Sequence, residues 1–268
     1  MHSFFQISAD ENIMGRTGRT RDNGYLQKTL PLDLSQKQQQ FNAAMERFHS
    51  MRIYGLFGQI VSLSNVFLQI YLLYRLWPHS IGIPWQAFSI LVAYVLTDFI
   101  NGLVHMFMDN NDRYDSVTGP LIANFHMHHK IPQYKRNKLP IVYFNETGSK
   151  VWLVGYLLAV SLLLEAGLDP VVLYTLVYIG ILSSVAEISH YLCHSSSAKT
   201  SIFLGNIGIL LSKRHHAKHH LEDNTCYAFL NGFTDPLLNL IAARLYKGYK
   251  KTTDLHYLQY VVTADQER

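Results

Sequence analysis

The chain alternates between long apolar stretches and strongly polar ones, and this pattern is the first guide to its architecture. Four apolar stretches stand out, at residues 53–77, 85–108, 151–164 and 171–191. A helix that crosses a bilayer needs about 20 mostly apolar residues, so the third stretch is short and the other three are long enough. We therefore predict an all-α, polytopic membrane bundle of about four transmembrane helices.

The polar segments between these stretches predict how the spans are joined. Pro78 and Pro84 bound a connection that is long enough only for a tight hairpin. The short apolar piece at residues 201–211 predicts an interfacial or re-entrant helix instead of a further span.

The polar ends set the domain boundaries. Residues 1–50 are polar and are expected to form a largely disordered N-terminal tail. Residues 51–250 would then form the membrane domain, and residues 251–268 a C-terminal tail.

The positive charges support this topology. All 23 Lys and Arg residues except Arg75 lie in the N-terminal tail, in the loop at 109–150 or in the region after the fourth span. Four spans place these three regions on one side, which the positive-inside rule identifies as cytosolic. We expect a multi-pass integral membrane protein, of the endoplasmic reticulum if eukaryotic and of the inner membrane if bacterial.

Composition narrows the possible classes of protein. Only 16% of the residues are charged, against roughly 25% in soluble domains. The net charge of +4 is dispersed, without the aromatic-interleaved basic patch of single-strand binders, so nucleic acid is not an expected partner. The two cysteines, Cys193 and Cys226, form no CxxC motif and are expected to be reduced thiols. No signal-peptide pattern precedes the first span.

Candidate chemistry comes from the histidines, because ten of the fourteen fall in four tight groups. In the four-span topology, every group lies at the same membrane face, forming a histidine-rich cap. The groups are His105 with the neighbouring Asp109; His126, His128 and His129; His190 and His194; and His215, His216, His219 and His220.

The spacing within these groups favours metal binding. Residues four apart share a helix face, so His105 with Asp109, and His190 with His194, can each chelate an ion. About eight imidazoles exceed what one ion can use, and they suit two ions that each keep an open position. A single interfacial histidine is usually an ordinary polar residue, and HHAKHH alone could be a solvated run. However, ionisable groups inside apolar spans are costly and indicate function.

Two acidic residues lie near these candidate ligands. Asp98 precedes His105 by seven residues and Glu187 precedes His190 by three, so either could accept a hydrogen bond that orients a ligand histidine. The alternative is that each pairs with a nearby lysine or amide. Cys193 lies between His190 and His194 but should face away from both, as a packing residue.

From about Asp98 to Leu245 the sequence resembles the membrane lipid-desaturase domain family, which includes plasmanylethanolamine desaturase, carotenogenesis protein F and plant fatty acid desaturase 4. The motifs that carry the resemblance are DFINGLVHMFMD, FHMHHKIP, FNETG, EISHYLCH and SKRHHAKHHLEDNTCYAFLNG. Plasmanylethanolamine desaturases carry a further histidine where this chain has Ile141, Val142 and Tyr143, so the resemblance does not fix the lipid.

The resemblance implies a ligand set and a reaction. It assigns metal ligation to His105, His128, His129, His190, His194, His216, His219 and His220, with Asp109 at an acidic position and with His126 and His215 as weaker candidates. It implies two iron ions and O2 as co-substrate. The reaction would desaturate a lipid acyl or alkyl-ether chain, as in plasmalogen or fatty acid metabolism.

Electrons would come from a cytochrome b5 or ferredoxin, because the chain has no haem, flavin or NAD motif. The alternatives left open are a lipid hydroxylase with the same metal site and a non-enzymatic metal-binding or transport protein. A zinc hydrolase, which usually uses three protein ligands per ion, is disfavoured by the surplus of histidines.

Overall fold

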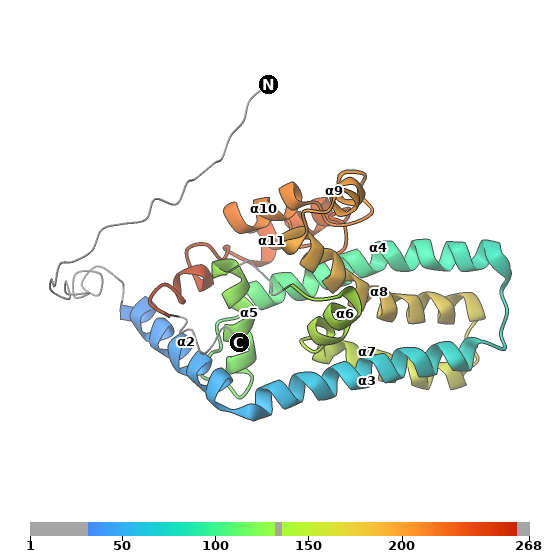
Figure 1. Cartoon of the computed structure of the whole chain (residues 1–268), viewed down its shortest axis with the longest axis horizontal. Coiled ribbons are helices and arrows are strands. Elements are labelled where there is room, and N and C mark those ends of the chain that lie inside the picture. The colour runs from blue at the N-terminus through green and yellow to red at the C-terminus, as the bar shows by residue number, and fades with distance from the viewer. Residues whose placement is uncertain (1–31, 132–135, 262–268) are drawn as a thin grey trace, which may run out of the picture.

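The computed structural model describes residues 32–131 and 136–261, and this part of the chain is helical, without strands. Three helices are long and apolar enough to cross a membrane: α3 (Arg52–Leu76), α4 (Gly82–Asp109) and α8 (Pro170–Ser195). They run side by side along the length of the molecule (Figure 1). The all-α membrane bundle predicted from the sequence is therefore confirmed.

The short third stretch becomes half of a broken span. Helix α6 (Leu139–Thr147) and helix α7 (Val151–Leu163) pass the span criteria together, but they meet at an angle of 86°. The break lies against α3, where a Cβ added at Gly148 would be 2.7 Å from the carbonyl oxygen of Gly58 and 2.8 Å from Oγ of Ser62. The bundle thus has three spans, or four if this bent pair counts as one.

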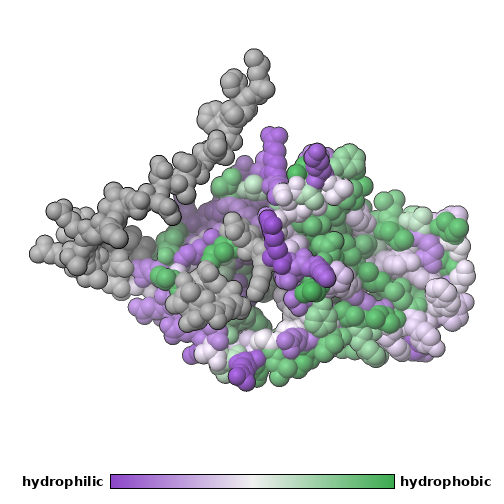
Figure 2. All heavy atoms as spheres, viewed as in Figure 1, coloured by the Kyte–Doolittle hydropathy of each residue, from purple (hydrophilic) through white to green (hydrophobic). Residues whose placement is uncertain are grey.

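The helices pack through an apolar core around α3, α7 and α8, with Leu72, Leu153, Leu157 and Val177 fully buried. Polar side chains join helices inside the bundle, as Asn101 of α4 does by donating to Ser183 of α8 at 3.0 Å. The outward faces carry large apolar side chains. Figure 2 shows hydrophobic residues gathered over the span helices, as expected of a lipid-facing surface.

Helices α3 and α4 run antiparallel to each other, and so do α7 and α8. The C-terminal ends of α4 and α8 therefore lie at the same end of the bundle (Figure 1). A helical cap covers that end. It consists of α2 (Leu32–Ser50), α5 (Gly119–Lys130), α9 (Lys199–Asn206), α10 (Lys213–Leu221), α11 (Asp235–Leu245) and the 3-10 turn η2 (Thr253–Leu255). The short α9 agrees with the prediction that residues 201–211 do not form a span.

Parts of both predicted tails are ordered in the structure. Residues 32–50 form α2, whose Phe41, Ala44 and Met45 are buried in a core with residues of α5. This helix was not predicted because only one of its faces is apolar, so the segment as a whole is polar. On the C-terminal side, Asp254 and Tyr257 are buried in the cap. Residues 1–31 and 262–268 lie outside the described residues.

Candidate metal centre

Nine of the side chains that the sequence analysis assigned to metal lie together at the junction of the bundle and the cap. Four helices that are far apart in the sequence supply them: α4, α5, α8 and α10. They form two adjoining groups. The Asp109 cluster contains His105, Asp109, His128, His129 and His219, and the His216 cluster contains His190, His194, His216 and His220.

The Asp109 cluster surrounds a carboxylate at the end of α4. The oxygens of Asp109 lie 3.3 Å from Nε2 of His105, 3.3 Å from Nε2 of His129 and 3.4 Å from Nε2 of His219. His129 and His219 also approach each other to 3.1 Å through their Nε2 atoms. Three separate helices therefore present nitrogen atoms to one buried carboxylate.

The His216 cluster consists of imidazoles alone. Nε2 of His216 lies 2.8 Å from Nε2 of His194, 3.0 Å from that of His190 and 3.0 Å from that of His220. His190 and His194 lie one turn apart on α8, as do His216 and His220 on α10, so the two helices face each other with paired histidines.

The two clusters are neighbours. The ring of His128 has its centroid 5.7 Å from that of His190 and 5.4 Å from that of His220. Phe229 packs on one histidine of each cluster, at 4.2 Å from His105 and 4.3 Å from His190 between ring centroids. The two clusters therefore lie side by side, joined through His128 and Phe229.

Main-chain carbonyls determine which nitrogen of three imidazoles carries the proton. Nδ1 of each lies within hydrogen-bonding distance of a carbonyl oxygen: His105 with Tyr227 at 2.8 Å, His128 with Phe125 at 2.6 Å, and His219 with Thr225 at 3.0 Å. A carbonyl only accepts, so the proton sits on Nδ1 and the lone pair of Nε2 points into the cluster.

For two of these imidazoles, no hydrogen-bond donor reaches the lone pair of Nε2. Nε2 of His105, Nε2 of His128 and both carboxylate oxygens of Asp109 are buried without a hydrogen-bond partner. Leaving buried polar atoms unpaired costs free energy, and a cation coordinated between them removes that cost. The donor set thus fits metal ions, because neutral imidazole is a common ligand of iron, zinc and copper.

Burial keeps the histidines of α10 in this neutral form. Burial, followed by the charges of His129 and His194, lowers the pKa of His220 to about 2. His216 and His219 are shifted in the same direction, again by burial first. Deprotonated imidazole is the form that binds a cation.

Several residues that the sequence analysis missed form hydrogen bonds with the clustered side chains or their main chain. Asp254 accepts a hydrogen bond from Nδ1 of His129 at 2.8 Å, and Thr253 donates to the carbonyl oxygen of Asp109 at 2.5 Å. The hydroxyl of Tyr249 lies 3.1 Å from Nδ1 of His219. The sequence carried no signal for these residues, since none has helical spacing to a histidine group.

Asp98 acts on the site through a loop. One of its oxygens accepts from the main-chain N–H groups of Leu230, Asn231 and Gly232, and the other from the N–H and the hydroxyl of Thr234. These bonds differ from both alternatives left open for Asp98, which were a ligand histidine and a nearby lysine or amide. Asp98 fixes the loop that follows Phe229, because a carboxyl group buried inside a membrane bundle requires several hydrogen-bond donors.

Glu187 pairs with Lys150 at 2.9 Å, which agrees with the second alternative left open for it, an ion pair with a lysine. Lys150 also donates to Asn101 and lies 5.6 Å above the ring of Phe229. This buried pair supports Phe229 and, through it, the stacked ring of His190.

The two weaker candidates lie apart from the clusters. His126 uses both of its ring nitrogens elsewhere, with Nε2 at 2.7 Å from the carbonyl oxygen of Met108 and Nδ1 at 2.9 Å from the hydroxyl of Tyr114. His215 faces Asp235, with Nε2 at 2.5 Å from the carboxylate. These contacts are all with residues outside the Asp109 and His216 clusters.

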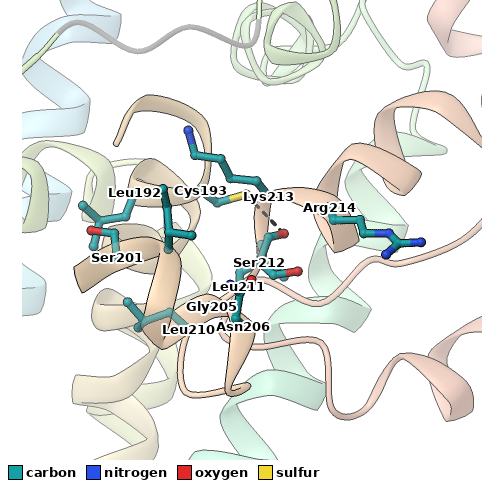
Figure 3. Close-up of a pocket in the computed structure, with 11 residues that line it drawn as sticks. Leu192, Cys193, Ser201, Gly205, Asn206, Leu210, Leu211, Ser212, Lys213 and Arg214 are labelled. Atoms are coloured by element: carbon teal, nitrogen blue, oxygen red, sulfur yellow. Dashed lines mark hydrogen bonds between the residues drawn. The ribbon is translucent and has the colours of Figure 1, made fainter. Parts of the chain in front are cut away.

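A small cavity of about 200 Å³ lies next to the centre, between the end of α8, helix α9 and the start of α10 (Figure 3). Cys193 lines it, with Sγ 3.7 Å from the carbonyl oxygen of Ser212. Cys193 thus faces away from the histidines on its own helix, as predicted, and the cavity contains none of the nine clustered side chains.

Comparison with known proteins gives one match. The family model of the lipid desaturase domain matches residues 94–249, more than half of the 268-residue chain. The match contains all nine side chains of the two clusters and ends before Asp254. No curated protein and no solved structure matches the chain.

Proposed function

The chain belongs to the lipid desaturase domain family, and from this we propose that it is an O2-dependent membrane desaturase that introduces a double bond into a lipid hydrocarbon chain. The observation that supports this proposal most is the convergence of eight imidazoles and Asp109 into two adjoining clusters at one end of the membrane bundle. Such a site lies where a lipid chain and a partner in the aqueous phase can both reach it.

We propose two iron ions as the occupants, one for each cluster. The Asp109 cluster would hold the first ion through His105, His128, His129 and His219 together with the carboxylate, and the His216 cluster would hold the second. Iron in this site would supply the O2-derived oxidising power that removes hydrogen from an unactivated methylene pair. Balancing the reaction requires two electrons and two protons from outside, because O2 leaves as two molecules of water.

The residues of the chain perform the positioning. Carbonyl oxygens and Asp254 hold the imidazoles in the metal-binding tautomer. Phe229 places an apolar ring against both clusters. The apolar helices offer the substrate chain a hydrocarbon-like environment. The lipid would be a phospholipid acyl chain or a plasmanyl alkyl-ether chain.

We propose that the electrons come from a cytochrome b5 or ferredoxin docking on the cap, and that this face is cytosolic. The charge asymmetry of the sequence supports that orientation, since Arg75 alone among the Lys and Arg residues lies on the opposite side.

Lipid analysis of cells that express the chain, compared with cells that lack it, tests the reaction. We expect lipid species lighter by two hydrogens with the wild type, none with His129→Ala, and a wild-type pattern with His79→Ala. His79 is an exposed histidine between α3 and α4, so it serves as the matched control. Products heavier by one oxygen would identify a hydroxylase, and bound metal without any lipid change would identify a non-enzymatic metal protein.

A further inference from the structure

A third group of metal-binding side chains lies outside the two clusters. His215 of α10, Cys226 and Asp235 of α11 each offer one donor atom, and the three atoms lie within 4.8 Å of one another. Sequence spacing does not connect these residues. The fold brings the start of α10, the loop after α10 and the start of α11 to one place.

We propose that His215, Cys226 and Asp235 form a separate zinc site. A thiolate, an imidazole nitrogen and a carboxylate oxygen are typical zinc donors, and three protein ligands leave a fourth position for water. The thiol separates this group chemically from the nitrogen-rich clusters, since soft sulfur favours zinc over iron in a site with few imidazoles.

The surroundings hold the three donors in place without a metal. Cys226 has a left-handed backbone with φ of 58°, which is uncommon for a residue with a side chain. Its N–H donates to Oδ1 of Asn239 at 2.9 Å. On the opposite side, a Cβ added at Gly232 would lie 2.6 Å from Nε2 of His215, so a glycine there leaves space for the imidazole.

An ion held between the donors would take the place of the hydrogen bond that joins Nε2 of His215 to Oδ2 of Asp235 at 2.5 Å. Asp235 uses Oδ1 to accept from the N–H of Ala228, which leaves Oδ2 facing His215. The side chain of His215 is 31% exposed, so an ion can reach it from solvent, whereas Cys226 is buried and only 5% exposed.

The position of this site gives it a structural consequence. Cys226 lies between Thr225 and Tyr227, whose carbonyl oxygens accept from Nδ1 of His219 and of His105. An ion bound to Cys226, His215 and Asp235 would fix this segment between α10 and α11. Zinc would thus hold two imidazoles of the Asp109 cluster in orientation without contacting that cluster.

Cobalt(II) titration of the full-length, metal-loaded and reduced protein tests the site. Cobalt substitutes for zinc, and a cobalt–thiolate bond gives a near-ultraviolet charge-transfer band that imidazole and carboxylate ligands do not give. The chain has two cysteines, so Cys193→Ser leaves Cys226 as its sole thiol. We expect the band to reach one equivalent per chain in the wild type and in Cys193→Ser, and zinc to displace it.

Two further variants complete the test. Cys226→Ser should abolish the band, and His215→Gln should weaken cobalt binding at least tenfold. Absence of the band in Cys193→Ser, or its persistence in Cys226→Ser, would overturn the proposal. The result from Cys193→Ser decides the matter even if Cys226→Ser fails to fold. These outcomes are independent of any lipid product, so they do not depend on the proposed desaturase activity.

Discussion

At the scale of single residues, the second nitrogen of each imidazole decides whether that histidine can bind metal. His126 and His128 lie two positions apart on α5, yet they differ in this respect. His126 has hydrogen-bond partners at both nitrogens, whereas Nε2 of His128 is buried without one. From these contacts we propose that His128 is a metal ligand and that His126 has a structural role.

This difference predicts opposite outcomes for the same substitution. His128→Gln should lower the metal content of the purified protein, because it removes a donor from the Asp109 cluster. His126→Gln should keep the metal content and lower the free energy of unfolding by about 1–3 kcal/mol, since buried partners lose their hydrogen bonds. Elemental analysis and thermal unfolding check both. Loss of metal from His126→Gln would contradict this assignment.

The residues behind the ligands lead to a second prediction. Asp254→Asn removes the carboxylate that accepts from His129, so affinity for the ion of the Asp109 cluster should fall about 10–100-fold. Metal titration followed by competition with a chelator measures this loss. Asp115→Asn, at an exposed position of the cap, should behave as the wild type. Equal affinities in the two variants would show that Asp254 does not support the centre.

Helical spacing explains how much of the site the sequence could predict. His105 with Asp109, and His190 with His194, follow from the four-residue repeat of a helix, so their pairing was visible before the fold was known. Asp254 and the carbonyl oxygens of Thr225 and Tyr227 were not, because tertiary contacts alone bring them to the histidines. For the same reason, the sequence could not reveal that Asp98 bonds a loop far along the chain.

At the scale of the helices, the break between α6 and α7 depends on close contact with α3. The sequence showed that residues 151–164 are short for a span, but it could not show that α6 completes the span at an angle of 86°. The bend requires Gly148 to approach the main chain of Gly58, and such a contact between distant segments has no local pattern.

Two glycines test this contact with the same substitution. Gly148→Ala should destabilise the protein by about 1–3 kcal/mol, because the added Cβ overlaps the carbonyl oxygen of Gly58. Gly155→Ala, on α7, should be neutral or slightly stabilising, since no atom lies within 4 Å of the added Cβ. Thermal unfolding in detergent compares them. Equal unfolding temperatures in the two variants would show that the close approach of Gly148 to Gly58 does not stabilise the fold.

At the scale of the whole molecule, the candidate metal centre joins the membrane bundle to the cap. The clusters take side chains from α4 and α8 of the bundle and from α5 and α10 of the cap. Bound ions would therefore stabilise the complete fold and not one helix. The prediction of four spans described the bundle well, but it left out the packing of α2 and the segment around η2 on this centre.

Removal of metal should consequently lower the unfolding temperature of the entire protein. An ion present at 100 times its dissociation constant stabilises a fold by about 2.7 kcal/mol, which corresponds to roughly 5–10 °C in a chain of this size. Scanning calorimetry with and without a chelator measures the shift. His128→Gln should respond less to the chelator, and an identical response would indicate that the ion binds elsewhere.

The contact between Thr253 and Asp109, 144 residues apart, has a consequence for biosynthesis. Translation at 5–20 residues per second needs roughly 7 to 30 s to cover that distance. During this interval the nascent chain already contains α4 with His105 and Asp109 at its end, but η2 has not yet been synthesised. Thr253 therefore cannot support Asp109 until long after the α4 segment has been made.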